Sequence, residues 1–224
     1  MRKAMLPGAT IALVLSSVVA VAPSSAADVE GFDELIKEKG LFKKTLIHPE
    51  ADFSTYRSLY QETVRIQFRS STGTESEQET GSLLRRRSTG SAVPDSEDRA
   101  KFGQIVSEAL AIELGRSAEF QLVEEAGPGT LILRASVLDI LSRIPSRSAG
   151  ETELRGRLIA QGTIVFDLID AETGVLQARM SERRRILRGD TSGPADLSMV
   201  WADIQQWAQR AAADLLQELG KPRS

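Results

Sequence analysis

The stretch Leu158–Asp170 reads LIAQGTIVFDLID and is the part of the chain that decides the fold. Its apolar residues alternate with polar ones, a pattern typical of a β-strand with one buried face. The next residues, DAETG over 170–174, have the composition of a tight turn. Asp170 can bond back to the turn amides, and Gly174 can adopt a positive φ. Residues 175–187 are then expected to return as the second strand of a long hairpin.

Three further strands are expected before this hairpin. They cover residues 59–68 (LYQETVRIQF), 120–124 (FQLVE) and 130–141 (TLILRASVLDIL). The Gly-Pro-Gly triplet over 127–129 leads into the last of them and is interpreted as a turn, because a phosphate-binding loop would need a lysine and a following helix.

Two segments have the periodicity of amphipathic helices. Asp95 is a suitable N-cap, and apolar residues then recur every three or four positions up to Gly115, which predicts a helix over 96–114. A second helix is expected over 194–219, with Pro194 in its first turn and Gly220 after its end. The apolar stripe of each helix must pack against the sheet.

The order strand, helix, four strands, helix predicts an α+β fold. We expect a two-layer α/β sandwich, in which a mixed, mostly antiparallel sheet of about five strands has two helices on one face. Residues 56–224 would form this single domain, with a disordered loop over 70–94 where Ser, Thr, Gly and Glu dominate. Residues 27–55 are interpreted as a polar lead-in segment with one possible short helix over 32–39.

The beginning of the chain has the pattern of a signal peptide. Arg2 and Lys3 precede an apolar stretch over 9–22, and small residues follow where signal peptidase would cut. We place the cut between Ala26 and Ala27. The stretch is shorter than the roughly 20 apolar residues that span a membrane, which disfavours an uncleaved anchor. We therefore expect a protein that resides in the periplasm or is secreted.

Composition excludes several classes of function. The chain has no cysteine, so we expect no lipid anchor, no disulfide and no thiolate chemistry. Loss of residues 1–26 removes Arg2 and Lys3 and changes the formal net charge from −3 to −5, so nucleic acid is not an expected ligand. We also expect no transmembrane segment in the mature chain and no cofactor.

Few residues qualify as site candidates. His48, the one histidine, lies beside Pro49 and is expected to be a loop residue. Arginine triplets over 85–87 and 183–185 match phosphates or carboxylates, although such runs also form solvated faces or guard sheet edges. Two tryptophans six positions apart should not share a direction, so one should be core and the other should flank it. The weak partner- or anion-binding candidates are Arg183, Arg184, Arg185, Trp201 and Trp207, with no catalytic residue and no metal ligand among them.

Three aspartates are candidates for an acid/base pair. Asp139, Asp167 and Asp170 would serve only if two carboxylates converged in a cleft. Asp167 alternates with the apolar set and should point away from the core, and the turn is a sufficient role for Asp170.

Three segments of the chain carry a resemblance to a known family. They cover residues 48–66 (HPEADFSTYRSLYQETVRI), 127–140 (GPGTLILRASVLDI) and 162–184 (GTIVFDLIDAETGVLQARMSERR). Together they resemble a bacterial envelope family, the domain of unknown function 3313. The resemblance spans roughly residues 40–220. It implies a small exported protein and no established activity, cofactor or catalytic residue. Many members of that family are lipoproteins, and this chain lacks the lipid-bearing cysteine.

Two functions remain open. The first, which we favour, is a non-enzymatic accessory or partner-binding protein of the cell envelope that docks onto a protein partner through a sheet face, a sheet edge or an aromatic anchor. The second is a periplasmic hydrolase, or a binding protein for a small lipid or peptidoglycan ligand, without a linear motif. A hydrolase should have acids converging in a deep pocket, whereas an accessory protein should have a shallow patch.

Overall fold

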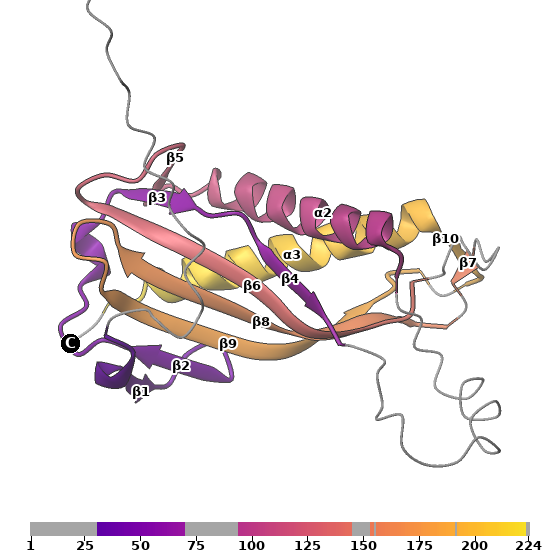
Figure 1. Ribbon diagram of the computed structural model, residues 1–224, viewed down its shortest axis with the longest axis horizontal. Helices are drawn as coiled ribbons and strands as arrows, with labels where there is room; N and C mark the ends of the chain where they lie inside the picture. The colour runs from indigo at the N-terminus through magenta and orange to yellow at the C-terminus, as the bar shows by residue number, and fades with distance from the viewer. Residues whose placement is uncertain (1–30, 70–93, 145–152, 155, 191, 223–224) are drawn as a thin grey trace, which may run out of the picture.

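The computed structural model describes residues 31–69, 94–144, 153–154, 156–190 and 192–222. Within these ranges, eight strands form one mixed sheet in the order β1-β2-β9-β8-β6-β3-β5, with β4 also paired to β6. Two helices lie side by side on one face of the sheet (Figure 1). The elements are η1 (Phe32–Glu34), β1 (Ile36–Glu38), β2 (Lys44–Ile47), η2 (Phe53–Thr55), β3 (Ser58–Gln61), β4 (Arg65–Phe68), α2 (Ser96–Leu114), β5 (Gln121–Val123), β6 (Thr130–Ser142), β7 (Glu153–Leu154), β8 (Leu158–Asp170), β9 (Leu176–Leu187), β10 (Ala195–Asp196) and α3 (Leu197–Leu219).

The long strands β6, β8 and β9 form the middle of the sheet. β8 pairs antiparallel with β9, which confirms the predicted hairpin, and also antiparallel with β6. On the face toward the helices, Leu133, Phe166 and Met180 are fully buried in one core together with residues of both helices. Burial of these alternating apolar residues is the main stabilising contribution of the hairpin.

Both helices begin at an aspartate cap. The carboxylate of Asp95 accepts the Asp98 amide at 2.8 Å, which confirms the predicted start of α2. α3 begins at Leu197 instead of Pro194, because Asp196 accepts the Met199 amide at 3.0 Å and so caps the helix. The two residues before α3 form β10, which pairs with β7.

The prediction of about five strands was too low. The strand expected over 59–68 is two strands, β3 and β4, and both pair in parallel with β6. Between them the Glu62 amide donates to the Leu133 carbonyl at 2.9 Å, and Val64 turns into the core. β5 pairs in parallel with β3, so the sheet is mixed. β3 and β4 have four residues each, too few for alternation to show where one strand ends and the next begins.

The described part of the lead-in segment, residues 31–55, also joins the sheet. The helix considered over 32–39 is instead η1 followed by β1, and β2 pairs antiparallel with β9. Phe42, Ile47 and Phe53 are buried in the common core. These single apolar anchors in a polar segment carry no periodic signal. The predicted signal peptide with its cut at Ala26 and Ala27, and the predicted loop apart from Pro94, lie outside the described residues.

The prediction that one tryptophan flanks the core was wrong. Trp201 is 5% exposed and Trp207 is 8% exposed. α3 packs against α2 as well as the sheet, so the buried part of its surface is wide enough to include both tryptophan side chains, which point in different directions. Neither tryptophan is available as an exposed anchor.

Candidate partner-binding face

The face of the sheet opposite the helices is the candidate site, and we call it the outer face. Its side chains come from β6, β8 and β9, at the positions that alternate with the core. In cross-strand register they form four rows: Arg134, Asp167 and Arg179; Ser136, Val165 and Ser181; Leu138, Thr163 and Arg183; and Leu141, Gln161 and Arg185. Side chains in one row are neighbours, so each row can be considered as a unit.

The first row is a set of ion pairs. Arg179 binds the carboxylate of Asp167 through two nitrogens at 2.5 and 2.7 Å, and Asp167 is only 5% exposed. Arg134 binds Glu62 in the same two-nitrogen manner at 2.8 and 3.2 Å. These hydrogen bonds raise the pKa of both arginines. Asp167 points away from the core as predicted, but the arginine beside it shields it from water.

The second and third rows are mostly neutral. Ser136, Val165 and Ser181 form one row, and Leu138 and Thr163 lie in the next; all five are half-buried. Charged side chains border these positions on both sides along the strands. The middle of the outer face is therefore a neutral strip framed by charge.

Asp139 holds two arginines beside this strip. Its carboxylate accepts hydrogen bonds from Arg69 at 2.5 Å on each oxygen and from Arg183 at 2.7 Å. The bonds from Arg69 and then Arg183 lower the pKa of Asp139 to about 2. Asp139 has a φ of 54°, in the left-handed region, at a register shift of β6 against β8. The shift turns the Asp139 carboxylate toward the two guanidinium groups.

The arginine triplet of β9 divides between the two faces. Arg183 and Arg185 lie in the rows of the outer face, whereas Arg184 points the other way and binds Asp214 of α3 at 2.7 Å. The Arg184 guanidinium also lies 5.2 Å from the ring centre of Phe42. Arg184 is therefore a contact between sheet and helix. In the described residues β2 pairs with β9 only as far as Ser181, so the triplet does lie on an edge of the sheet.

A hollow of about 400 Å³ lies at the end of the outer face. We call it the arginine hollow, and it is lined by Arg157, Leu158, Gln161, Arg185 and Leu187. Within the described part of the chain, the guanidinium groups of Arg157 and Arg185 have neither an ion pair nor a hydrogen bond, and both residues are exposed. The hollow therefore combines two available cations with apolar side chains.

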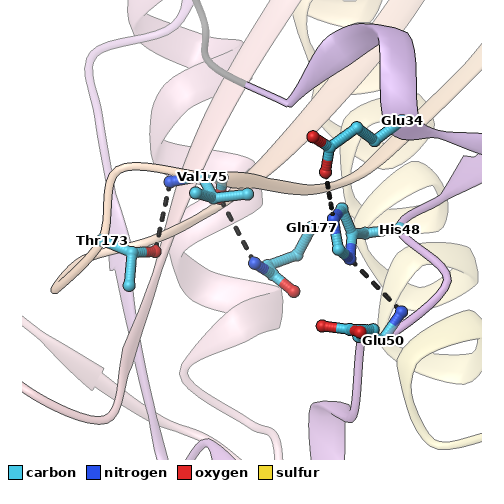
Figure 2. A network of polar contacts seen from close by, with 6 residues as sticks. All are labelled: Glu34, His48, Glu50, Thr173, Val175 and Gln177. Atoms are coloured by element: carbon cyan, nitrogen blue, oxygen red, sulfur yellow. Dashed lines mark hydrogen bonds and ion pairs between the residues drawn. The ribbon is translucent and has the colours of Figure 1, made fainter.

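His48 connects the segment after β2 to the opposite end of β9 and to Glu34. Its Nε2 lies 2.8 Å from Glu34 Oε2, and its Nδ1 accepts the Glu50 amide at 3.3 Å (Figure 2). The His48 amide donates to the Gln177 carbonyl at 2.8 Å. Because Nδ1 is an acceptor, the neutral ring carries its proton on Nε2 and donates it to Glu34. His48 thus has a structural role that agrees with its interpretation as a loop residue.

A larger hollow, of about 850 Å³, lies where η2, the loop before β5 and the end of α3 meet. Its polar side chains bind their own turns: Asp52 accepts the Ser54 amide at 2.9 Å, and Arg57 donates to the Ser54 carbonyl at 2.8 Å. Tyr56 at its wall donates to Asp170 at 2.7 Å. Burial raises the pKa of Tyr56, and the bond to Asp170 raises it further. Among the described residues that line this hollow, the acids are Asp52 and Glu119, and the Asp52 carboxylate is engaged by the Ser54 amide.

The three aspartates that were acid/base candidates in the sequence have separate roles. Asp139 and Asp167 each bind arginines, and Asp170 accepts the turn amides of Glu172 and Thr173 at 2.9 and 2.7 Å. Burial alone would raise the pKa of Asp170, but the bonds from Thr173, Tyr56 and Glu172 together lower it. Within the described ranges no three His, Asp or Glu side chains come together as a metal-ligand set.

Several residues of the outer face were not candidates in the sequence. Arg134, Arg179 and Arg157 lack a run of like charge, which is the signal that identified the triplet. Alternation along β8 and β9 could place Arg179 on the outer face, but the row that it shares with Asp167 depends on strand register. Triplet 85–87 lies outside the described residues.

No family model matches this chain, and no curated protein matches it. Similar solved structures include a hypothetical protein, CT253, from Chlamydia trachomatis, with 11% identity, a TM-score of 0.39 and coverage of 73% of this chain and 98% of that one. The PelC dodecamer from Paraburkholderia phytofirmans has 12% identity, a TM-score of 0.36 and coverage of 80% and 96%. A protein of the domain of unknown function 330, XCC0632 from Xanthomonas campestris, has 11% identity, a TM-score of 0.39 and coverage of 71% and 81%.

All three TM-scores lie below 0.5. None of the helices in the described ranges has the length and the apolar content that crossing a membrane requires.

Proposed function

We propose that this chain is an exported, non-enzymatic accessory protein of the bacterial cell envelope, which binds a protein partner through its outer face. The observation that carries the proposal is the neutral strip, bordered by charged side chains and consisting of half-buried Ser136, Leu138, Thr163, Val165 and Ser181. A centre depleted of charge with a charged rim is the composition of a protein interface. The resemblance to the domain of unknown function 3313 and the signal-peptide pattern over 1–26 support an envelope protein.

The carboxylates of the outer face pair with arginines, and this pairing supports a partner-binding function over a catalytic one. Asp167, Asp139 and Glu62 each form short hydrogen bonds with arginine. An acid/base pair needs carboxylates whose environments separate their pKa values and leave one of them able to take a proton. The guanidinium groups occupy oxygens of these carboxylates, so the role of the carboxylates on the outer face is to order its side chains.

A crosslinked pull-down from intact cells tests the proposal. The wild type is compared with Ser181→Arg, which adds a long cation to the neutral strip, and with Ala213→Arg, which adds the same group to the exposed side of α3. We expect one protein partner, recovered with the wild type and with Ala213→Arg but not with Ser181→Arg. Failure to recover a partner above background, together with hydrolysis of envelope polymers by the purified protein, would overturn the proposal.

A further inference from the structure

The arginine hollow at the end of the outer face has the chemistry of a phosphate site. Two guanidinium groups, from Arg157 and Arg185, line it together with the amide of Gln161. Gln161 and Arg185 are direct cross-strand partners, so the amide and the guanidinium group stand side by side. We propose that this hollow binds the phosphate of an anionic phospholipid headgroup. The inference goes beyond the proposed protein contact, which uses the neutral strip.

The arginines of the hollow differ from the other arginines of the outer face. Arg134, Arg179 and Arg183 each bind a carboxylate of this chain. A ligand anion would have to displace that carboxylate. In the described part of the chain Arg157 and Arg185 bind none, so an external anion would displace no carboxylate of the described residues. A guanidinium fork matches the oxygens of a phosphate with charge-assisted hydrogen bonds.

The apolar side chains indicate which phosphate would bind. Leu158 and Leu187 are cross-strand partners at the same hollow, and Leu187 is 40% exposed. An inorganic phosphate would leave these leucines in water. A phospholipid would place the apolar part of its glycerol backbone and ester linkages beside them while its phosphate faces the arginines. The combination of cations and leucines therefore favours an amphiphile.

The net negative charge of the whole chain makes the position of the two hollow arginines important for membrane binding. The formal net charge is −3 for the full chain, so an anionic membrane repels the molecule as a whole. Local cations at one end of the sheet would orient the molecule with that end toward the lipid surface. Each arginine near an anionic surface increases binding about fivefold, so loss of both should weaken it roughly 25-fold.

Vesicle flotation tests the inference. The full chain is expressed with its own beginning, and every variant is compared with the wild type in the same processed form, so that residues 1–26 contribute equally. The probes are phosphatidylglycerol vesicles, phosphatidylcholine vesicles and inorganic phosphate. Arg157→Gln combined with Arg185→Gln removes the two cations of the hollow. Arg116→Gln combined with Arg210→Gln removes two exposed cations on the helix side and is the matched control.

We expect binding to phosphatidylglycerol vesicles that falls roughly 25-fold in the hollow variant and changes less than about twofold in the control. Leu187→Ser should weaken vesicle binding and leave any binding of inorganic phosphate unchanged. Equal binding to both kinds of vesicle, equal loss in the control, or binding of inorganic phosphate without vesicle binding would overturn the inference. None of these outcomes affects the pull-down with Ser181→Arg, so the two proposals can fail separately.

Discussion

Glu218 is a buried carboxylate in the last turn of α3, and replacing it with alanine should lower the stability of the fold. The residue is 2% exposed. Its Oε2 accepts the Leu41 amide at 2.6 Å and pairs with the Lys221 ammonium at 2.7 Å. Glu218 therefore joins the loop before β2 to the end of α3. In Glu218→Ala the Leu41 amide loses its acceptor and the Lys221 charge loses its partner.

The expected loss is about 2–3 kcal/mol. A hydrogen bond to a charged group contributes about 1.5–3 kcal/mol. The ion pair adds less than about 1 kcal/mol, since the Lys221 side chain is 39% exposed and water screens it. In a domain of this size 1 kcal/mol corresponds to about 2–4 °C in Tm, so Tm should fall by about 4–12 °C.

Thermal unfolding followed by circular dichroism measures this loss. Glu218→Gln keeps an acceptor for the Leu41 amide and should lose less than half as much stability as Glu218→Ala. Gln217→Ala, at the exposed neighbouring position, is the control and should change stability by less than about 0.5 kcal/mol. Gly40→Ala should resemble Glu218→Ala, because a β-carbon there would overlap the Thr45 hydroxyl and lie 2.8 Å from Glu218 Oε1. A Tm of Glu218→Ala that matched that of Gln217→Ala would refute this reasoning.

Two further predictions concern pH and one concerns burial. The pKa of Asp139 is lowered to about 2 by Arg69 and Arg183, so its contribution to stability is present at neutral pH and is lost as pH falls from about 4 toward 2. Asp139→Asn should have a lower urea midpoint than the wild type at neutral pH and the same midpoint near pH 2; a constant difference would contradict the pairing. The pKa of Tyr56 is raised by burial and by Asp170, so its contribution is present below about pH 10 and is lost as pH rises further. Tyr56→Phe should lack this alkaline loss of stability, and an alkaline unfolding curve identical to that of the wild type would be evidence against it. Trp201 and Trp207 are the only tryptophans, and both are buried, so iodide should quench little of the native fluorescence, whereas strong quenching would show an exposed indole.

Elements whose structure depends on residues close together in the sequence were predicted correctly. The Asp95 cap of α2, the turn at Asp170 and the hairpin of β8 and β9 each depend on contacts within one element or one turn. The strands β1 and β2 were missed, and the strand expected over 59–68 is divided into β3 and β4, because these short strands form only when a neighbouring strand supplies their hydrogen bonds. β1 pairs with β2 and β2 pairs with β9, whereas β3 and β4 both pair with β6. Such pairing over long sequence distances produces no local pattern.

The candidate site was predictable only in part, for the same reason. Alternation separates Arg184 from Arg183 and Arg185, and this could be inferred from the sequence. Which of them remains available could not, because Arg183 is bound by Asp139 of β6 and Arg184 by Asp214 of α3. Arg185 can bind an external anion because no carboxylate of the described residues pairs with it. This absence follows from the sheet register and cannot be inferred from the sequence.

The most direct measurement of the proposed partner contact is a crosslinking map with single cysteines, which the cysteine-free chain allows. Ser181→Cys and Thr163→Cys place the reagent on the outer face, and Ala213→Cys and Gln217→Cys place it on the exposed side of α3. In intact cells we expect one protein adduct of the same size from both outer-face positions and none from α3. Adducts of equal yield from all four positions, or from α3 alone, would contradict binding through the outer face.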